Sequence, residues 1–281
     1  MNQRLIDKLL DILIGIFIFL TLLFAGMEGY EYLQIQSRKE TINDYLYIQG
    51  VESSKETFSS LEPEVPSQKE LNDSKIYPKE KESKEDYKEV IPVVSKDFFE
   101  EYPKAVAWLY EPALEINYPI MQAQDNDYYL THSYDDTGNR YGSLFLDSRC
   151  RMEDDVLLIH GHNARIRTMF GGLRSYVDSS YVAAHPTMWF GIKNPSASCA
   201  DVALEEYQIK MVSIVCDTAR IYSVLDEAAI SELKENAFSF FEIDSKEPEV
   251  PHDAQIILLS TCYGVSGTDK RLVIAIQRTI K

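Results

Sequence analysis

The chain opens with one long apolar stretch, over residues 9–27. Only Asp11 interrupts it, Arg4 and Lys8 precede it, and Glu28 follows it. About 20 apolar residues span a bilayer as a helix, and positive charge tends to stay on the cytoplasmic side. The pattern therefore predicts an uncleaved membrane anchor with everything after it outside the cytoplasm. A cleaved signal peptide is the alternative, although FAGMEGY offers only a weak cleavage site.

A polar stretch follows the apolar one. Residues 28–50 are able to continue as a helix, and the Glu-, Lys- and Ser-rich sequence up to about residue 90 predicts a solvated linker that sets reach. An acidic docking tail is the minority alternative. We expect three parts: a cytoplasmic tip and anchor over 1–27, an extracellular acidic stalk over 28–96, and a folded domain over 97–281.

Short apolar runs fill the folded domain. FFEEYPKAVAWLY has helical spacing and predicts a helix near 98–109, whereas 168–178 and 226–242 read as two further helices, the last with Asp226 as its N-cap. Turn-rich pieces separate the runs that read as strands. These runs cover 113–122, 141–147, 156–163, 205–217, 220–225, 255–262 and 271–278. Many short strands and few helices predict a mainly β fold, a closed or nearly closed barrel.

Charge and cysteine content narrow the function classes. The 281 residues carry a formal net charge of −17, which argues against nucleic-acid binding because phosphates are neutralised by clustered Lys and Arg. The four cysteines, Cys150, Cys199, Cys216 and Cys262, are too sparse for a disulfide framework. Cys216 lies in an apolar run and is expected to be a buried small hydrophobe.

Cys262 is the strongest candidate nucleophile. It ends the apolar run IILLSTC, and the turn-like YGVSGTD follows it, so its sulfur should lie at the mouth of a strand. Arg271 begins the next strand and would lie across from Cys262 if the two strands form a hairpin. A cation at that place would stabilise a thiolate or a developing oxyanion.

His162 is the candidate proton-transfer partner. It follows the apolar run VLLI in HGHN, and strand alternation places His160 and His162 on the same side of the sheet. Two such histidines could also bind a metal. No further His, Cys, Asp or Glu cluster has zinc-like spacing, so we expect no metal site.

These motifs together resemble the signature of the sortases, the membrane-anchored cysteine transpeptidases of Gram-positive bacteria. LLSTC followed by an Arg in the next strand, with an upstream GHN, carries the resemblance. INYPIMQAQDNDYYL, GSLFLDSR, LLIHGHN and TMFGGLRSY resemble the class B pattern in the same order, from about residue 97 to the end. The resemblance implies an eight-stranded closed β-barrel with an N-terminal helical extension and a helix between the sixth and seventh strands.

The resemblance also implies roles for individual residues. Cys262 is the nucleophile, His162 the general acid and base, and Arg271 the cation that positions substrate and stabilises the oxyanion. His160 stands where class B enzymes more often have Tyr, so no role is carried onto it. The positions that match the substrate groove are Asn126, Leu130, Ser260 and Thr261.

The implied reaction is acyl transfer without a cofactor. The enzyme would cleave a C-terminal sorting signal of a secreted protein after Thr, form a thioacyl-enzyme and pass the protein to an amine. A peptidoglycan cross-bridge amine would mean surface-protein anchoring, and a pilin Lys amine would mean pilus polymerisation. An inactive sortase-like binding protein and a hydrolytic cysteine peptidase are the remaining alternatives.

Overall fold

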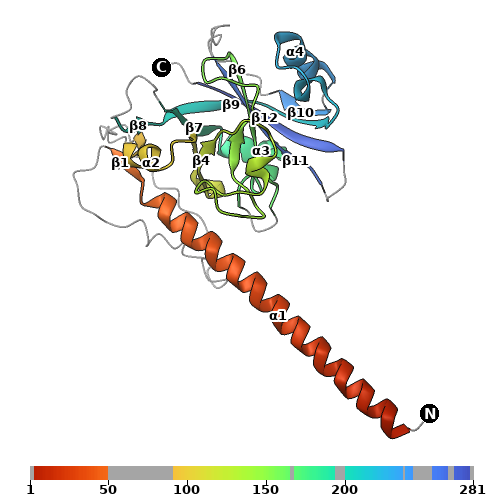
Figure 1. Cartoon of the computed structure of the whole chain (residues 1–281). Helices are drawn as coiled ribbons and strands as arrows, with labels where there is room; N and C mark the ends of the chain where they lie inside the picture. Colours follow the sequence, from red (N-terminus) through yellow and green to blue (C-terminus); the bar gives the residue numbers. More distant parts are fainter. Residues whose placement is uncertain are drawn as a thin grey trace, which may run out of the picture.

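The structure, a computed structural model, describes residues 3–49, 91–164, 168–193, 200–236, 238–242, 255–264 and 269–278. It consists of a long N-terminal helix attached to a β domain (Figure 1). Cys199, most of the acidic stretch and part of the loop between Cys262 and Arg271 lie outside the described residues.

The helix α1 (Gln3–Asn43) contains the whole predicted anchor and continues 16 residues past it, as the sequence analysis expects for the region after residue 28. Within the described residues, α1 is the one helix that is long and apolar enough to cross a membrane, and its most apolar window is not buried at all. The helix therefore fits a transmembrane segment. The strand β1 (Leu46–Gln49) follows the helix and pairs with β2 (Ile91–Val94).

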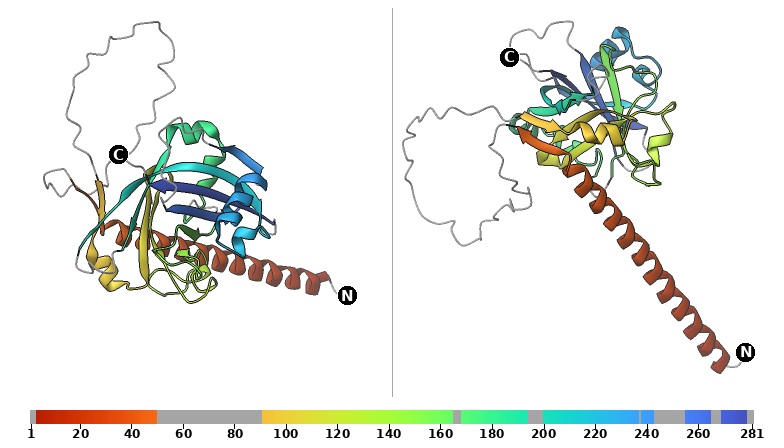
Figure 2. Two further views of the ribbon diagram at one scale, coloured as in Figure 1. Left: turned by 90° about the horizontal axis from the view of Figure 1, so that it is seen from above. Right: turned by 60° about the vertical axis from the view of Figure 1, so that its left-hand side comes forward.

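Eight strands close into a barrel (Figure 2). Around the ring they follow the order β9-β12-β11-β6-β5-β4-β3-β7, and the pairing of β7 with β9 closes it. The β4–β5 and β6–β11 pairs are parallel, and the other six pairs are antiparallel. The strands are β3 (Ala105–Glu111), β4 (Ile116–Met121), β5 (Leu144–Leu146), β6 (Val156–His160), β7 (Thr187–Ile192), β9 (Glu205–Cys216), β11 (Ile256–Cys262) and β12 (Lys270–Arg278). The predicted eight-stranded closed barrel is confirmed.

Among the described residues, four short strands lie outside this ring. β8 (Val202–Ala203) joins β1 and β2 in a small separate sheet. β10 (Phe238–Glu242) pairs with the second half of β9, beyond the part that β7 occupies.

The first predicted helix is wrong in its second half. The helix α2 (Lys96–Glu101) begins at the cap Ser95, whose hydroxyl accepts from the Asp97 amide, and it ends before Pro103. Proline cannot continue a helix, and it restricts the residue before it as well. The chain then forms β3, in which Trp108 and Leu109 are both fully buried. Burial on both faces of a barrel strand hides the alternation that would have indicated β structure.

Three other predictions need correction. Residues 168–178 form no single helix but a tight turn and the 3-10 helix η3 (Leu173–Val177), followed by α3 (Ser179–Ala184), because Gly171 and Gly172 disfavour a helix. The run 220–225 contains the 3-10 helix η4 (Arg220–Tyr222) rather than a strand. The helix predicted over 226–242 ends at Asn236, and aromatic residues then form β10.

The helix α4 (Glu227–Asn236) itself is confirmed, with its cap. The carboxylate of Asp226 accepts from the Ala229 amide at 2.7 Å, which satisfies one of the free N–H groups of the first turn. In chain order α4 lies between the sixth and seventh strands of the barrel, β9 and β11, as the sequence analysis expects. Two further 3-10 helices complete the fold: η1 (Pro112–Leu114) and η2 (Tyr128–Leu130).

The described cysteines are all free thiols. Cys216 is exposed rather than buried, because it is the last residue of β9 and its side chain lies at the rim of the barrel. Cys150 lies in the loop between β5 and β6 and is buried. Burial raises the pKa of the Cys150 thiol to about 11, which makes this thiol unreactive at neutral pH.

Candidate active site

The candidate site lies at the carboxyl ends of two neighbouring parallel strands, β6 and β11. His160 and Ser260 are register partners, and His162 and Cys262 each follow two residues later along the chain. Carboxyl ends of parallel strands meet at one edge of a sheet, so His162 and Cys262 lie at the same edge. The amide Nδ2 of Asn163 ties the two segments together, because it donates to the Cys262 carbonyl at 2.8 Å.

Cys262 and Arg271 face each other across a hairpin. β11 and β12 are antiparallel, and their register places Cys262 opposite Arg271. Arg271 Nη1 donates to Cys262 Sγ at 2.8 Å, and the thiol is exposed. A guanidinium at this distance offers N–H donors to the sulfur and to an oxyanion formed beside it.

His162 is held by a backbone carbonyl. Its Nε2 lies 2.9 Å from the oxygen of Leu130, at the end of η2. A carbonyl oxygen only accepts, so this bond requires a proton on Nε2 and leaves Nδ1 of the neutral ring free to take one. The backbone is fixed as well, because the Phe170 amide donates to the His162 carbonyl at 3.0 Å. No hydrogen bond joins His162 to Cys262 in the described part of the chain.

The two residues before Cys262 point to opposite sides of β11. Ser260 shares a side with Cys262, and its hydroxyl lies 2.8 Å from the phenol oxygen of Tyr222. Thr261 is buried on the other side, and its hydroxyl donates to the Gly161 carbonyl at 2.8 Å. Thr261 therefore supports the strand end structurally, an arrangement that does not favour the expected contact with substrate.

Tyr222 was not identified by the sequence analysis, which placed it in a predicted strand. It lies in η4, and burial raises the pKa of its phenol to about 12, so the hydroxyl stays protonated and able to donate. Its contact with Ser260 places Tyr222 on the side of β11 that carries Cys262. Only the fold brings it there, since 38 residues separate it from Ser260.

Asn126 lies just before η2, and Leu130 is its last residue. The Asn126 oxygen Oδ1 accepts from the Ser148 amide at 2.7 Å, which fixes the side chain and leaves its NH₂ group as the donor. Leu130 is half-buried, and its carbonyl is the acceptor for His162. Leu130 is thus joined to His162, whereas Asn126 is joined to the loop after β5.

A second imidazole lies beside the site, in a cluster that the sequence analysis did not identify. His160 Nε2 is 3.0 Å from the carboxylate of Asp147, and Arg149 binds the same carboxylate through Nε and Nη2, each at 2.8 Å. Burial alone would raise the pKa of Asp147, but the hydrogen bonds from Arg149 and His160 outweigh burial and hold that pKa well below its usual range. The sequence feature that could have identified Asp147 is its position directly after the run that forms β5.

Among the residues that the structure describes, no three or more His, Cys, Asp or Glu side chains gather in a way that could hold a metal ion.

Comparison with known proteins agrees with this geometry. No protein-family model matches the chain. Sortase B of Listeria monocytogenes is 33% identical over 175 residues, which cover 60% of this chain and 67% of that relative. The chain belongs to the sortase B family. Sortase B of Staphylococcus aureus is 24% identical over 178 residues, 60% of this chain and 68% of that protein.

Solved sortase B structures share the fold. The structure of Clostridium perfringens sortase B has a TM-score of 0.55 at 20% identity and covers 66% of this chain and 99% of its own. A Staphylococcus aureus sortase B–substrate complex has a TM-score of 0.53 at 21% identity, with 66% of this chain and 83% of that chain covered. Family membership and fold together indicate that this sortase is a cysteine transpeptidase.

Proposed function

We propose that this sortase is anchored in the membrane by α1 and transfers secreted proteins from a C-terminal sorting signal to an amine of peptidoglycan. The observation that carries the proposal is the contact between Arg271 Nη1 and Cys262 Sγ, at the edge where His162 also lies. The apolar residues 12–27 of α1, which contact no part of the barrel core, support the anchor. Arg4 and Lys8 favour a cytoplasmic N-terminus and an extracellular catalytic domain.

The first half of the reaction forms a thioacyl-enzyme. The Cys262 thiolate attacks the carbonyl carbon of the Thr in the sorting signal, and the oxygen takes up negative charge beside Arg271. His162 gives a proton to the leaving amine as the peptide bond breaks. A donor such as Arg271 typically contributes about 10²–10³ in rate to this kind of step.

The second half releases the product. A primary amine attacks the thioacyl carbonyl, His162 takes its proton, and the Cys262 thiolate leaves. The proton that His162 gave in the first half is thus recovered in the second, and no cofactor takes part.

The sorting signal would bind on the surface beside the nucleophile. The NH₂ group of Asn126, the side chain of Leu130 and the hydroxyl pair of Ser260 and Tyr222 are the groups we assign to it. The Staphylococcus aureus relative has been solved with a substrate, which supports such a binding surface in this chain. Thr261 is not assigned to substrate binding, because its buried hydroxyl donates to the Gly161 carbonyl.

The test is acyl capture by the full chain in detergent micelles. A panel of sorting-signal peptides is incubated with the protein and a free amine, and mass spectrometry follows both the adduct on Cys262 and the peptide–amine product. We expect both species with the natural chain and neither with Cys262→Ala. Absence of any thioacyl adduct across the panel contradicts the proposal. A strong preference for a pilin Lys peptide over a cross-bridge amine would assign the enzyme to pilus polymerisation instead.

A further inference from the structure

The part of α1 that follows the apolar stretch packs along the catalytic domain. Ile35 and Ile42 are buried, with 9% and 3% of their surface exposed, whereas the apolar side chains between residues 12 and 27 are exposed. Figure 1 shows α1 as one straight helix whose upper end lies against the β domain. The helix thus has a half that belongs to the domain and a half that does not.

Polar contacts join the first turns after the apolar stretch to the loop 131–143. Arg140 binds the Glu28 carboxylate through both nitrogens of its fork, at 3.1 and 2.9 Å, and its Nε lies 2.7 Å from Glu31. Arg38 donates to the hydroxyl of Thr137 at 3.0 Å. A bidentate guanidinium–carboxylate pair fixes orientation as well as distance.

The docking continues to the end of the helix. Lys39 lies 3.3 Å from the Glu115 carboxylate, and the side chain of Asn117 in β4 donates to that of Asn43 at 2.8 Å. The chain stays on the domain afterwards, since β1 pairs with β2. Four turns of α1 are therefore held by contacts at both ends and by apolar burial between them.

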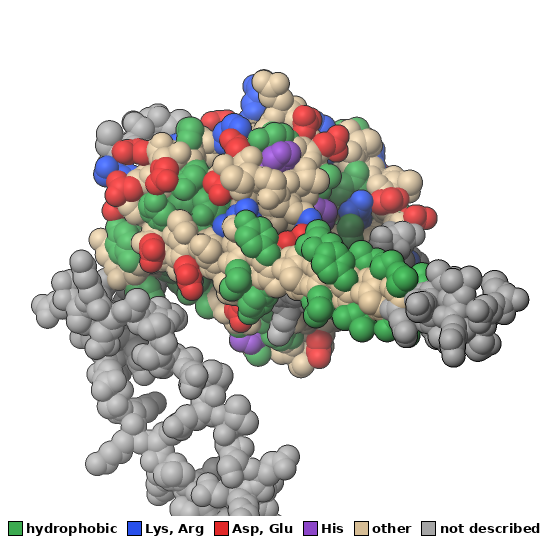
Figure 3. Space-filling model, turned by 60° about the horizontal axis from the view of Figure 1, so that its bottom comes forward, with side chains coloured by type: hydrophobic (Ala, Val, Ile, Leu, Met, Phe, Trp, Pro, Cys, Tyr) green, Lys and Arg blue, Asp and Glu red, His purple; other side chains and the backbone are tan. Residues whose placement is uncertain are grey.

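These contacts begin at the first residue after the predicted span, so the domain lies next to the membrane surface. A cleft of about 830 Å³ separates α1 from the loop. It is lined by Leu22, Leu23 and Met27 of α1 and by Asn139, Arg140 and Tyr141 of the loop. Leu22 to Met27 rise about 8 Å along a helix axis, so the loop stands level with the last apolar turns. Figure 3 shows hydrophobic side chains gathered along this part of the helix.

We propose that α1 is a rigid strut that docks the catalytic domain on the outer surface of the bilayer, with the loop 131–143 in the headgroup layer. The partner of this surface is a lipid bilayer, and the proposal rests on the membrane anchoring proposed above. The domain is then held at one height and one tilt, and the acidic stretch does not set its reach.

The docked loop is also the one that leads to the site. It begins directly after Leu130, whose carbonyl holds His162, and the Asn139 amide donates to the Thr131 carbonyl at 2.8 Å. Arg140 follows Asn139 in the chain and forms the ion pairs with Glu28 and Glu31 of α1. Arg140 is therefore a positioning residue, which acts on His162 through the loop.

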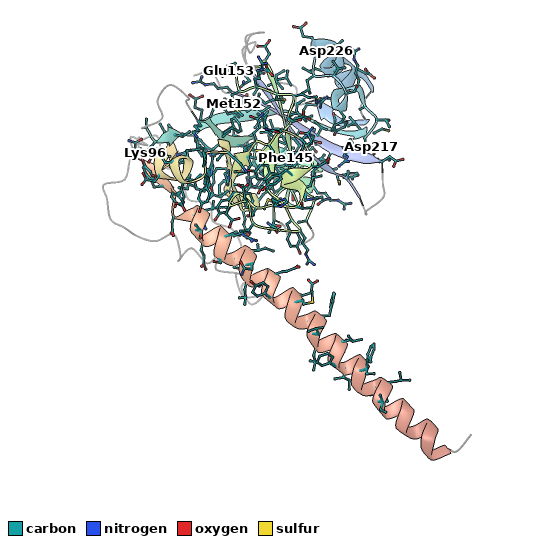
Figure 4. All side chains as sticks on the ribbon, viewed as in Figure 1. Lys96, Phe145, Met152, Glu153, Asp217 and Asp226 are labelled. Carbon is teal, nitrogen blue, oxygen red and sulfur yellow. The ribbon has the colours of Figure 1, made fainter. Side chains whose placement is uncertain are left out.

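The experiment uses the full chain in nanodiscs with a quencher on the lipid headgroups. A dye is attached at Glu153 through an azide-bearing amino acid, because Glu153 is exposed and lies on the side of the domain away from α1 (Figure 4). We expect one narrow distance distribution between dye and bilayer. Arg140→Glu, which faces Glu28 and Glu31 with a like charge, should broaden it, and the triple variant Glu28→Arg/Glu31→Arg/Arg140→Glu should restore it. Arg278→Glu, at the far end of β12, is the matched control and should leave it unchanged.

Two further measurements separate the parts of the proposal. Arg140→Glu should lower kcat by about threefold or more, a factor that corresponds to the free energy of one exposed ion pair. The rate at which Cys262 is alkylated should not change. The proposal is overturned if membrane-bound wild type and Arg140→Glu show the same broad distribution. If the chain does not enter bilayers, the proposed anchoring fails, and so does the placement on lipid. The docking of α1 on the domain is then tested by itself, through amide hydrogen exchange over residues 35–43 in detergent. Arg140→Glu should speed this exchange, and equal exchange rates in wild type and variant would contradict the docking.

Discussion

Arg271 Nη1 and Cys262 Sγ lie 2.8 Å apart because the two residues are register partners in the antiparallel pair β11–β12. The register therefore places the two side chains on the same side of the sheet, next to each other. Rigid placement of this kind is what electrostatic stabilisation of an oxyanion requires.

Replacing Arg271 tests this arrangement. Arg271→Ala should lower kcat by about 10²–10³, because the oxyanion loses its donor. Arg271→Lys keeps the charge but not the planar guanidinium group, so its kcat should lie between those of wild type and Arg271→Ala. Rates of peptide transfer to an amine measure the effect, and circular dichroism confirms the fold. Turnover of Arg271→Ala within threefold of wild type would show that another group stabilises the oxyanion.

The two histidines of HGHN give a matched pair. His162→Gln should lower kcat by about 10²–10⁴, the usual contribution of a general acid and base. His160→Gln should retain most of the turnover, because the Nε2 of His160 is already bound to Asp147. Single-turnover acylation measures both variants. An equal loss in the two variants would mean that the acid–base role is wrongly assigned.

The thiols should differ in reactivity. Cys262 is exposed beside a guanidinium and Cys216 is exposed at a strand end, whereas Cys150 is buried. With a pKa of about 11, only about 10⁻³ of Cys150 is thiolate at pH 8. Iodoacetamide at pH 8 should therefore modify Cys262 and Cys216, and Cys150 only after a denaturant is added. Mass spectrometry of the peptides reads the result, and rapid labelling of native Cys150 would contradict its burial.

Asp147 should make stability depend on pH. Its pKa is lowered on folding, so its contribution is fully present above the unfolded value of about 3.9 and is lost as pH falls below that value. Asp147→Asn should cost about 1–3 kcal/mol of unfolding free energy at pH 7, because the buried carboxylate bonds of Arg149 and His160 are lost or weakened. Urea unfolding at pH 7 and pH 3 measures the effect. The difference in unfolding free energy between wild type and variant should be smaller at pH 3 than at pH 7. A larger difference at pH 3 would contradict a lowered pKa of Asp147.

The acidic stretch should be dispensable for the fold. Gln49 and Ile91 are register partners of β1 and β2, so the chain leaves and re-enters the domain at one place. Replacing residues 50–90 by Asn-Gly, a favoured two-residue hairpin turn, should keep activity and stabilise the domain by up to about 2 kcal/mol, because a shorter loop costs less closure entropy. Thermal unfolding and peptide transfer measure both. Loss of folding in this variant would show that the stretch has a structural role.

Local patterns decided a large part of this protein. The apolar stretch, the strand runs that became β4, β6, β9, β11 and β12, and the cap Asp226 were all predicted from the sequence. Each depends on neighbours within a few residues, which is the range over which hydrophobic periodicity and capping act. The motifs around Cys262 and Arg271 belong to the same class, since the two residues lie nine positions apart.

Only the tertiary structure decided the rest. β3 was mistaken for a helix because barrel burial covers both of its faces, and Cys216 was placed inside because an apolar run does not show where a strand reaches the rim. The contacts of Leu130 with His162, of Tyr222 with Ser260 and of Arg140 with Glu28 join residues 32, 38 and 112 positions apart. No local pattern encodes such pairs, because they form only when a closed barrel and a docked helix bring distant segments to the same place.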